Sequence, residues 1–477
     1  MKFSQVKTYQ APKWLVYFAF VILFSNFNAR ATNTNEALVG TFTLPDPLIM
    51  LNGQPVQTTN DWIYLRRPEI LKMYEDYIYG RSPKWRNMLD RKREVNGLAF
   101  GGKAVRKQID LEFYNYNRYS GTNNSNTNDL KLHVLLYTPT GMTNPVPVFL
   151  CLSFSGNYAV ANDSNILIYP IWDRKNGTLA MPTNIDRGSS HSWNIEKTLA
   201  RGYGIAIVDY NDIEPDLADG SGVKYGVRSL YLNRDHTSLG PDEWGAISAW
   251  AWGASRVLDY LQTDKSVDAK RVIMLGQSRL GKTALWAGAE DQRFAMVIAS
   301  CSGEMGAALA RRDYGETVTT MSKSFPYQFC GNFLDYSNDI SDMPVDSHML
   351  ISLIAPRPLF LNTGSEDRWS DPRGEFQAAI AAAPVYQLFG EQSVMTNLPS
   401  DCGTNGSGSI LTSTILETYK MPPLDIPIMR DVGFQTHTGK HDILPDDWDR
   451  FLDFADLHFY GKQPHQYPAV QTANKNP

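Results

Sequence analysis

Short apolar runs recur along the chain, separated by polar or helix-like segments. A typical run is Ile205-Ala-Ile-Val208, which contains no polar residue. Strands buried on both faces of a sheet have this uninterrupted apolar pattern, whereas half-exposed strands alternate. The pattern therefore predicts buried strands at 148–154, 204–210, 271–276, 296–300, 358–363 and 427–434.

Two longer segments have apolar residues at helical spacing. The segment 244–261 places on one face Trp250, Ala254, Val257, Leu258 and Leu261. A second segment, near the C-terminus, places on one face Trp448, Phe451, Leu452 and Ala455. Strands that alternate with helices indicate an α/β fold, a three-layer sandwich whose central sheet is mostly parallel and flanked by helices.

An Asn-rich stretch at 120–129 separates two strand-like segments. Before it, Ile109, Leu111 and Phe113 alternate with acidic residues, and after it the segment 132–137 is mostly apolar. Two such strands joined by a polar segment predict a β-hairpin with a long loop. A polar, Gly- and Ser-rich segment at 395–423 predicts a surface insertion.

The N-terminus has the pattern of a secretory signal peptide. Three lysines precede an apolar run at 14–24, and the small residues of Ala29-Arg-Ala31 follow as a cleavage site. The run is short for a membrane span, although an uncleaved anchor is the alternative. We therefore predict a signal peptide at 1–31, a single catalytic domain at 32–477, and a secreted or periplasmic location.

Composition narrows the class of protein. The chain has 477 residues, 43% hydrophobic and 20% charged, with a net charge of −5, which is typical of a soluble globular protein. Without a basic block, nucleic acid is not an expected partner. No C-x-x-C or H-E-x-x-H pattern predicts a metal or cofactor. In an exported protein Cys151, Cys301, Cys330 and Cys402 could form disulfides, with the pairing left open.

The stretch Gly276-Gln-Ser-Arg-Leu-Gly-Lys282 carries the strongest chemical signal. A predicted strand leads to Ser278 and a helix-like run at 283–289 follows, which is the setting of a nucleophilic serine. Leu280 occupies the position of the second glycine in G-x-S-x-G, and Gly281 follows one residue later. The alternative is an ordinary Gly-Ser turn.

A nucleophilic serine needs a base and an acid to orient that base. In α/β-hydrolases the acid and then the histidine follow the serine along the chain. Here Asp367 follows the strand at 358–363, and His437 and His441 are expected in the loop after the next strand. We prefer His441 as the base because it lies just before the last amphipathic helix. The alternative for Asp367 is a helix cap or a solvated carboxylate.

Two cations follow the serine, and an aromatic residue follows the acid. Arg279 and Lys282 could stabilise an oxyanion or hold an anionic or hydroxyl-rich substrate, or could instead cap a loop or pair with Asp291. Trp369 could stack on a sugar ring or lie in the core.

These residues resemble the G-x-S-R-x-G-K signature of the glucuronoyl esterases, carbohydrate esterase family fifteen. The resemblance spans nearly all of 32–477 and includes Leu44-Pro-Asp-Pro47, Arg67-Pro-Glu-Ile-Leu71, Ser302-Gly-Glu-Met-Gly-Ala-Ala-Leu309, Ile354-Ala-Pro-Arg-Pro358 and Glu366-Asp-Arg-Trp-Ser-Asp-Pro372. It implies an α/β-hydrolase fold and cofactor-free, metal-free hydrolysis of 4-O-methyl-glucuronoyl esters that link glucuronoxylan to lignin alcohols. Separately, we expect a monomer that, once mature, does not bind membranes.

The resemblance also implies roles for individual residues. Ser278 is the expected nucleophile, His441 the base and Arg279 a contributor to the oxyanion hole. Lys282, Glu316 and Trp369 are expected to hold the sugar. Many members have a glutamate where this chain has Cys301, and others have the acid after a later strand. That second position matches Asp367, which we expect to be the acid, with Glu304 as the alternative.

Two other functions fit the same sequence less well. One is a different carbohydrate esterase, which removes acetyl or feruloyl groups from xylan and does not require cations beside the sugar carboxyl. The other is a non-catalytic glycan-binding protein, against which the presence of Ser278, Asp367 and His441 argues.

Overall fold

The structure is a computed structural model, and it describes residues 32–83, 89–113, 130–190, 192–232, 238–394 and 412–467. The described residues from Asn33 onward belong to one compact unit. The predicted signal peptide at 1–31 and Cys402 lie outside the described residues, so both predictions stay open. Among the described helices, none combines the length and the apolar character needed to cross a membrane.

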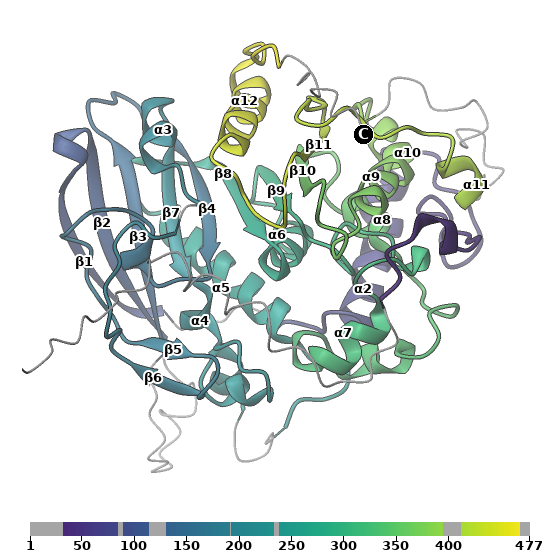
Figure 1. Ribbon diagram of the computed structural model, residues 1–477, viewed down its shortest axis with the longest axis horizontal. Helices are drawn as coiled ribbons and strands as arrows, with labels where there is room; N and C mark the ends of the chain where they lie inside the picture. Colours follow the sequence, from purple (N-terminus) through teal and green to yellow (C-terminus); the bar gives the residue numbers. More distant parts are fainter. Residues whose placement is uncertain are drawn as a thin grey trace, which may run out of the picture. The chain divides into compact units, whose positions relative to one another are not determined.

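A nine-stranded sheet forms the centre of the fold, with the strand order β1-β2-β3-β7-β4-β8-β9-β10-β11 (Figure 1). The six strands from β7 to β11 in this order are parallel, and β1, β2 and β3 extend the sheet with antiparallel pairing. The strands of this sheet are β1 (Leu89–Ala99), β2 (Ala104–Phe113), β3 (Leu130–Pro139), β4 (Val146–Ser153), β7 (Gly204–Asp209), β8 (Val267–Gln277), β9 (Met296–Ser300), β10 (Leu359–Gly364) and β11 (Val432–His437). A separate two-stranded sheet pairs β5 (Ile171–Asp173) with β6 (Thr178–Ala180).

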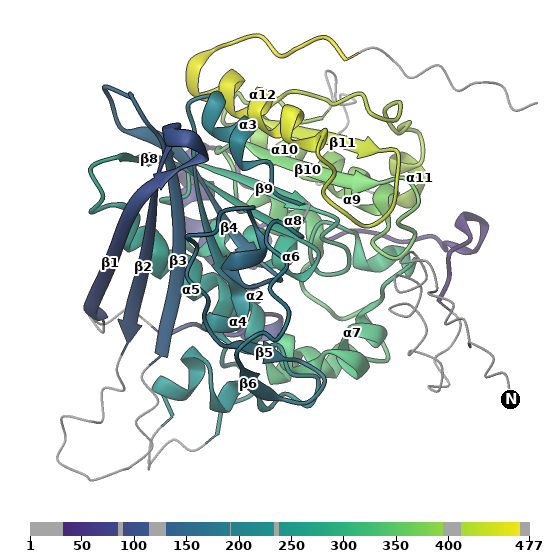
Figure 2. The ribbon, with the colours of Figure 1, turned by 60° about the vertical axis from the view of Figure 1, so that its left-hand side comes forward.

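Helices cover both faces of the large sheet. They are α1 (Thr59–Asp61), α2 (Arg67–Tyr77), α3 (Ile195–Ala200), α4 (Tyr210–Ile213), α5 (Ala246–Leu261), α6 (Arg279–Glu290), α7 (Val318–Ser324), α8 (Ser347–Ser352), α9 (Pro372–Ala381), α10 (Ala383–Leu388), α11 (Ser413–Leu416) and α12 (Asp447–Tyr460). Figure 2 shows α3 and α12 together over one face, while α5, α6 and α8 lie on the other. The predicted mostly parallel α/β sandwich is confirmed.

The uninterrupted apolar runs are explained by two hydrophobic cores, one on each face of the sheet. In β4, Leu150 belongs to the core that includes α5 and α6, whereas its neighbour Cys151 belongs to the core that includes α3 and α12. Successive residues of β8 divide in the same way, with Met274 in the first core and Leu275 in the second. Because side chains alternate between faces, a strand covered on both sides can be apolar at every position.

Most predicted elements match the structure. The helix predicted at 244–261 is α5, and the residues predicted to share its apolar face are buried. The hairpin prediction holds for its strands, because β2 and β3 pair in antiparallel register. The helix after Ser278 is longer than predicted, since α6 begins at Arg279.

The strand predicted at 427–434 is misplaced. β11 begins at Val432 and ends at His437. Ile428 instead turns back and exchanges two backbone hydrogen bonds with Phe434. His437 is therefore the last residue of the strand and not part of the loop after it.

The surface insertion predicted at 395–423 stays a prediction, and its described part, 412–423, is anchored to the body of the fold at two points. Thr412 forms an antiparallel bridge with Thr43, and Leu416 of α11 is fully buried. The residues 395–411 lie outside the described chain.

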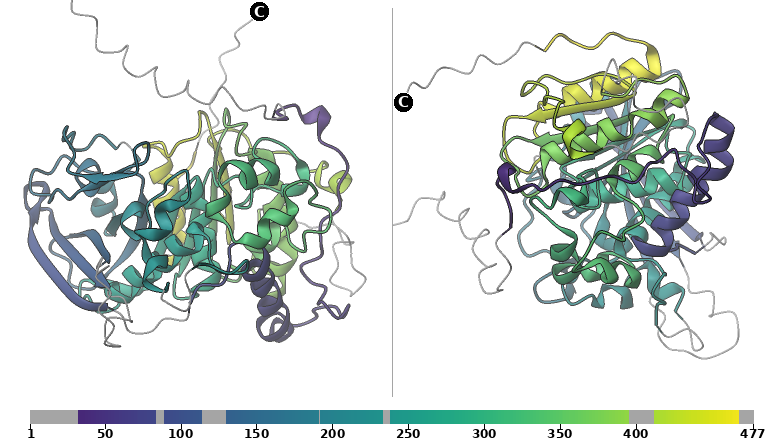
Figure 3. Two further views of the ribbon diagram at one scale, coloured as in Figure 1. Left: turned by 90° about the horizontal axis from the view of Figure 1, so that it is seen from below. Right: turned by 90° about the vertical axis from the view of Figure 1, so that its right-hand side faces the viewer.

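The segment before the sheet packs across the helices on one face. Arg67 of α2 donates to the carbonyl of Ala289 at the end of α6, and the Tyr74 hydroxyl donates to the carbonyl of Asp346 just before α8. Figure 3 shows this segment, in purple, beside the teal and green helices. The segment that contains α2 therefore supports α6 and α8 from the outside.

Candidate active site at the carboxyl ends of the parallel strands

Four neighbouring parallel strands end at the same edge of the sheet. Gln277 at the end of β8 pairs with Ser300 at the end of β9, and Gly364 at the end of β10 pairs with His437 at the end of β11. From β4 the chain passes to β7 on one side of it. The later strands β8, β9, β10 and β11 follow in order on the other side of β4, so the direction of strand order reverses between β4 and β8. Open α/β sheets bind ligands at this edge beside such a reversal.

Ser278 occupies a sharp turn between β8 and α6. Its backbone has φ 58° and ψ −129°, a conformation in which L-residues are strained. The Ser278 amide donates to the carbonyl of Ser300, which fixes the turn to β9. Gly276 is required here, because a Cβ on it would lie 1.9 Å from the carbonyl oxygen of Leu280. These features match the strand–turn–helix setting of a nucleophilic serine.

The displaced second glycine has a steric explanation. The Leu280 side chain is fully buried in the core. Gly281 faces β9 instead, where a Cβ would lie 2.9 Å from the carbonyl oxygen of Ser300. Position 281, and not 280, is therefore where the first turn of the helix lies against the end of the next strand.

Asp367 and His441 meet in the loops after β10 and β11. Asp367 Oδ2 lies 2.6 Å from His441 Nδ1. The carboxylate is buried, whereas 35% of the His441 side chain is exposed. Because an ionised carboxylate can only accept, this contact places the ring proton on Nδ1 and leaves Nε2 free to accept one.

Backbone contacts join the two loops. The Ser365 amide donates to the carbonyl of His437, and the Glu366 amide donates to the carbonyl of Gly439. Gly364 allows this approach, because a Cβ there would lie 2.3 Å from the carbonyl oxygen of Lys440. Gln277, next to Ser278, donates its side-chain amide to the carbonyl of His441 at 3.4 Å. The three predicted site residues therefore lie in segments in mutual contact.

Ser370 is a site residue that the sequence did not reveal. Its Oγ lies 3.1 Å from His441 Nδ1, and its amide donates to Asp367 Oδ1. Burial alone would raise the pKa of Asp367, but the His441 and Ser370 hydrogen bonds outweigh burial and lower it. Asp367 is thus ionised at neutral pH.

Two other candidates lie in structural positions. Glu304 is buried, and burial together with Asp346 and Glu316 raises its pKa well above the ordinary value. It makes no described contact with His441. His437 is also buried, with Nδ1 3.1 Å from Asp447 and Nε2 3.0 Å from the carbonyl of Lys440. The geometry therefore favours Asp367 and His441.

Arg279 is held by a buried carboxylate, Asp216, which the sequence also did not reveal. The Arg279 guanidinium donates to Asp216 Oδ2 and lies over the rings of Phe154 and Phe325. Asp216 also accepts hydrogen bonds from two tyrosine hydroxyls and an ion-pair contact from Arg174. Burial would raise the pKa of Asp216, but Arg279 and Arg174 lower it. The suggested pairing of Arg279 or Lys282 with Asp291 is wrong.

Lys282, Glu316 and Trp369 form one connected group. Lys282 Nζ donates to Glu316 Oε2 at 2.9 Å, and Trp369 Nε1 donates to Glu316 Oε1 at 2.7 Å. Trp369 is 40% exposed, so it is not a core residue. A Cβ on Gly303 would lie 2.7 Å from Glu316 Oε2 and 3.4 Å from Ser370 Cα, which places this group beside the Asp367–His441 pair.

The three described cysteines, Cys151, Cys301 and Cys330, are buried free thiols. Cys301 follows β9 and lies at the site. Its sulfur, a carboxylate oxygen of Asp367 and a ring nitrogen of His441 are all within 4.8 Å of one another.

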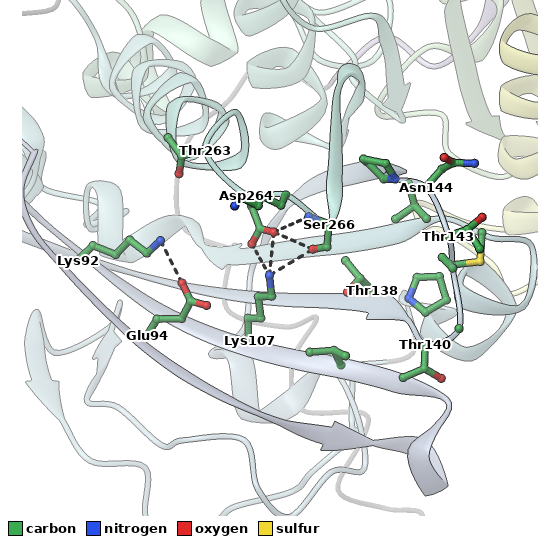
Figure 4. A pocket seen from close by; sticks show the side chains of 17 residues that line it. Lys92, Glu94, Lys107, Thr138, Thr140, Thr143, Asn144, Thr263, Asp264 and Ser266 are labelled. Atoms are coloured by element: carbon green, nitrogen blue, oxygen red, sulfur yellow. Dashed lines mark hydrogen bonds and ion pairs between the residues drawn. The ribbon is translucent and has the colours of Figure 1, made fainter.

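A separate cavity of about 660 Å³ lies at the opposite end of the sheet. Its lining includes Val146 at the start of β4 and Ser266 just before β8, so it is far from the carboxyl ends of these strands. Figure 4 shows Lys107 there, bonded to Asp264 and Ser266, and Lys92 paired with Glu94. These four charged side chains are paired, and the described residues that line the cavity include no histidine that could act as a base for a serine.

Comparisons with known proteins identify the family to which the chain belongs. A family model described as glucuronyl esterase, fungi, matches residues 196–390. The carbohydrate esterase MZ0003, from an unknown prokaryotic organism, is 38% identical over 437 residues, which cover 91% of this chain and 93% of that protein. A 4-O-methyl-glucuronoyl methylesterase from Phanerochaete carnosa is 27% identical over 272 residues, which cover 52% of this chain and 64% of that protein.

The fold matches a solved structure over a similar length. A glucuronoyl esterase from Solibacter usitatus superposes with a TM-score of 0.78 at 40% identity, covering 89% of this chain and all of that chain. The identity and coverage are high enough to establish family membership as well as fold. The chain therefore belongs to the glucuronoyl esterases of carbohydrate esterase family fifteen, and it is a carbohydrate esterase of the 4-O-methyl-glucuronoyl methylesterase type.

Proposed function

We propose that this esterase cleaves 4-O-methyl-glucuronoyl esters between glucuronoxylan and lignin alcohols, and that Ser278, His441 and Asp367 form its catalytic triad. The observation that carries the proposal is the 2.6 Å contact between Asp367 and His441, at the sheet edge where β8 delivers Ser278. The group formed by Lys282, Glu316 and Trp369 lies beside it.

His441 acts first as a general base. Asp367 holds the ring proton on Nδ1, so Nε2 takes the proton of the Ser278 hydroxyl. The Ser278 oxygen then forms a bond to the carbonyl carbon of the uronoyl ester, and the carbonyl electron pair moves onto its oxygen. Ionised Asp367 stabilises the imidazolium that results.

Two donors at the start of α6 can stabilise the negative oxygen. The backbone N–H of Arg279 lies in the first turn, where no helical acceptor is available. The Arg279 side chain adds a permanent positive charge that Asp216 holds in place. The amide of Ser278 is not such a donor, because it is bonded to Ser300.

The remaining steps reverse the proton transfers. The imidazolium of His441 protonates the departing alcohol oxygen as its bond to the carbonyl carbon breaks. A water molecule then gives a proton to His441 and attacks the acyl group on Ser278. His441 returns that proton to Ser278 as the bond between the Ser278 oxygen and the acyl carbon breaks. The glucuronic acid that forms releases its remaining acidic proton to solvent and leaves as the anion.

The sugar is held by neighbouring polar and aromatic groups. Glu316 accepts from both Lys282 and Trp369, so the three side chains present a fixed set of donors and acceptors to sugar hydroxyls. The exposed indole of Trp369 offers a flat apolar surface for the sugar ring or its methoxyl group. An ester joining wall polymers requires an exported enzyme, which agrees with the predicted signal peptide.

The test compares hydrolysis of a benzyl glucuronate ester and an acetylated xylan by the wild type, Ser278→Ala and Ser341→Ala. Ser341 is an exposed turn residue and serves as the matched control. We expect the wild type and the control to cleave the uronate ester, and Ser278→Ala to lose several orders of magnitude in turnover. Acetate release alone would reject the proposed substrate, and near-native turnover of Ser278→Ala would reject the nucleophile.

A further inference from the structure

Cys301, Asp367 and His441 form a group with the chemistry of a metal site. The sulfur, a carboxylate oxygen and a ring nitrogen lie within 4.8 Å of one another. Cys301 and Asp367 are buried, whereas the His441 ring reaches solvent. An ion can therefore approach from the histidine side and reach two buried ligands.

The donor set suits Zn²⁺ and related ions of intermediate softness. Thiolate, imidazole and carboxylate are the three side-chain ligands that Zn²⁺ uses, at bond lengths of about 2.0–2.3 Å. Ligand atoms around a tetrahedral zinc are consequently about 3.4–3.6 Å apart. The Asp367–His441 separation of 2.6 Å must open by about 1 Å or less to accept the ion, which a turn of the part-exposed His441 ring can supply.

The Cys301 sulfur has no strong competing partner among the described contacts. Its two contacts, with the Ser300 hydroxyl and the carbonyl of Asp442, are both 3.8 Å long. Ser370 Oγ, 3.1 Å from His441 Nδ1, is available as a neutral fourth ligand, and water is the other choice. A zinc ion bound here would thus exchange weak sulfur contacts for a bond.

We propose that Cys301, Asp367 and His441 bind Zn²⁺ and that the bound ion switches off the esterase. Binding displaces the thiol proton of Cys301 to solvent, so that sulfur binds as thiolate. The ion occupies Nδ1 of His441, and the proton formerly on Nδ1 moves to Nε2. Nε2 can then no longer accept the Ser278 proton, and the acid–base contact with Asp367 is lost.

The binding part of this proposal is independent of the proposed triad, whereas the inhibitory part rests on it. Binding is tested with Co²⁺, whose bond to a thiolate gives a charge-transfer absorption band. We expect the band in the wild type, in Ser278→Ala and in the control Cys330→Ser, and its loss in Cys301→Ser and Cys301→Ala. A missing band in the wild type, or an unchanged band in the Cys301 variants, would overturn the site. Thermal unfolding verifies that each variant is folded.

Inhibition is tested by titrating Zn²⁺ against ester hydrolysis, with each variant compared with its own metal-free rate. Changing a residue that only hydrogen-bonds to a metal ligand lowers metal affinity about 10- to 100-fold. Loss of Cys301, which would bind the ion directly, should therefore raise the half-inhibiting Zn²⁺ concentration by about 100-fold. Cys330→Ser should respond as the wild type does. Equal inhibition of wild type and Cys301→Ser would overturn the proposal. If no variant hydrolyses the ester, the proposed function fails, while the Co²⁺ band still decides the site.

Discussion

The buried carboxylate of Asp216 holds the guanidinium of Arg279, the residue directly after Ser278. Two tyrosine hydroxyls and Arg174 bond to the same carboxylate. Arg279 is thus kept in one position by a residue from the loop after α4, on the other side of the strand reversal.

Asp216→Asn should therefore reduce turnover by weakening the placement of Arg279. Loss of a direct oxyanion donor costs about 100- to 1,000-fold, and a positioning residue should cost less, about 10- to 100-fold in kcat. Removing the charge also leaves Arg279 and Arg174 without their shared anion. This should lower the free energy of unfolding by about 3 kcal/mol. Steady-state kinetics and urea unfolding measure the two effects separately.

The matched control is Asp219→Asn, because Asp219 is an exposed residue of the same loop. A double-mutant cycle separates positioning from simple destabilisation. If Asp216 acts through Arg279, adding Asp216→Asn to Arg279→Ala should cost little further kcat. Fully additive losses would contradict the positioning role.

Asp367→Asn should be far more damaging than Glu304→Gln. An amide at position 367 can donate to His441 Nδ1 and so favours the wrong imidazole tautomer, a change that costs about 10,000-fold in kcat in a serine–histidine–aspartate triad. Burial raises the pKa of Glu304, and its carboxyl makes no described contact with His441, so glutamine should be a mild replacement there. Kinetics on a glucuronate ester decide the ranking, and the reverse order would assign the acid to Glu304.

Trp369 should contribute to substrate binding more than to chemistry. Trp369→Ala removes the exposed ring and the hydrogen bond to Glu316, and we expect KM to rise about 10-fold with a smaller change in kcat. Trp369→Phe keeps an aromatic ring but loses the indole N–H donor, so its KM should lie between those of the wild type and Trp369→Ala. An unchanged KM in Trp369→Ala would exclude stacking on the sugar.

Stability should depend on pH through Glu375, a buried carboxyl beside the site. Burial raises its pKa from 4.5 to about 8, although it accepts from the Gly303 amide and the Ser302 hydroxyl. Between these values the folded state holds a proton that the unfolded chain has released. The stabilising contribution is thus complete below about pH 4.5 and is lost as the pH rises toward 8.

Urea unfolding at pH 5, 6.5 and 8 measures this effect against Glu375→Gln. One proton corresponds to a slope of up to about 1.4 kcal/mol per pH unit in the unfolding free energy. The wild type should show this extra decline and Glu375→Gln should not. Glu290, whose pKa is also about 8, is present in both proteins, so their difference isolates Glu375. Parallel curves would contradict the assignment.

The sequence predicted the features that depend on local order. Strands buried on both faces have uninterrupted apolar runs, and Ser278, Asp367 and His441 each follow such a run at the same edge. The strand at 427–434 was misplaced because its apolar residues include Ile428, which turns back onto Phe434. From the sequence alone, an apolar residue that packs beside a strand cannot be distinguished from an apolar residue within it.

The residues that the sequence did not reveal act through distant contacts. Asp216 meets Arg279 across 63 positions of the chain, and Ser370 meets His441 across 71. Neither belongs to a local pattern, since an aspartate or serine in a loop is more often a cap or a turn residue. Only the arrangement of the strands brings each to its partner.

The two loops that carry Asp367 and His441 are fastened to each other by backbone hydrogen bonds, with Gly364 lying against the Lys440 carbonyl. They therefore constitute one exchangeable module and not two. Grafting only one of them from a relative would leave amides and carbonyls of the other without partners. Chimeras of this family should transfer both loops, with Gly364, as a single cassette.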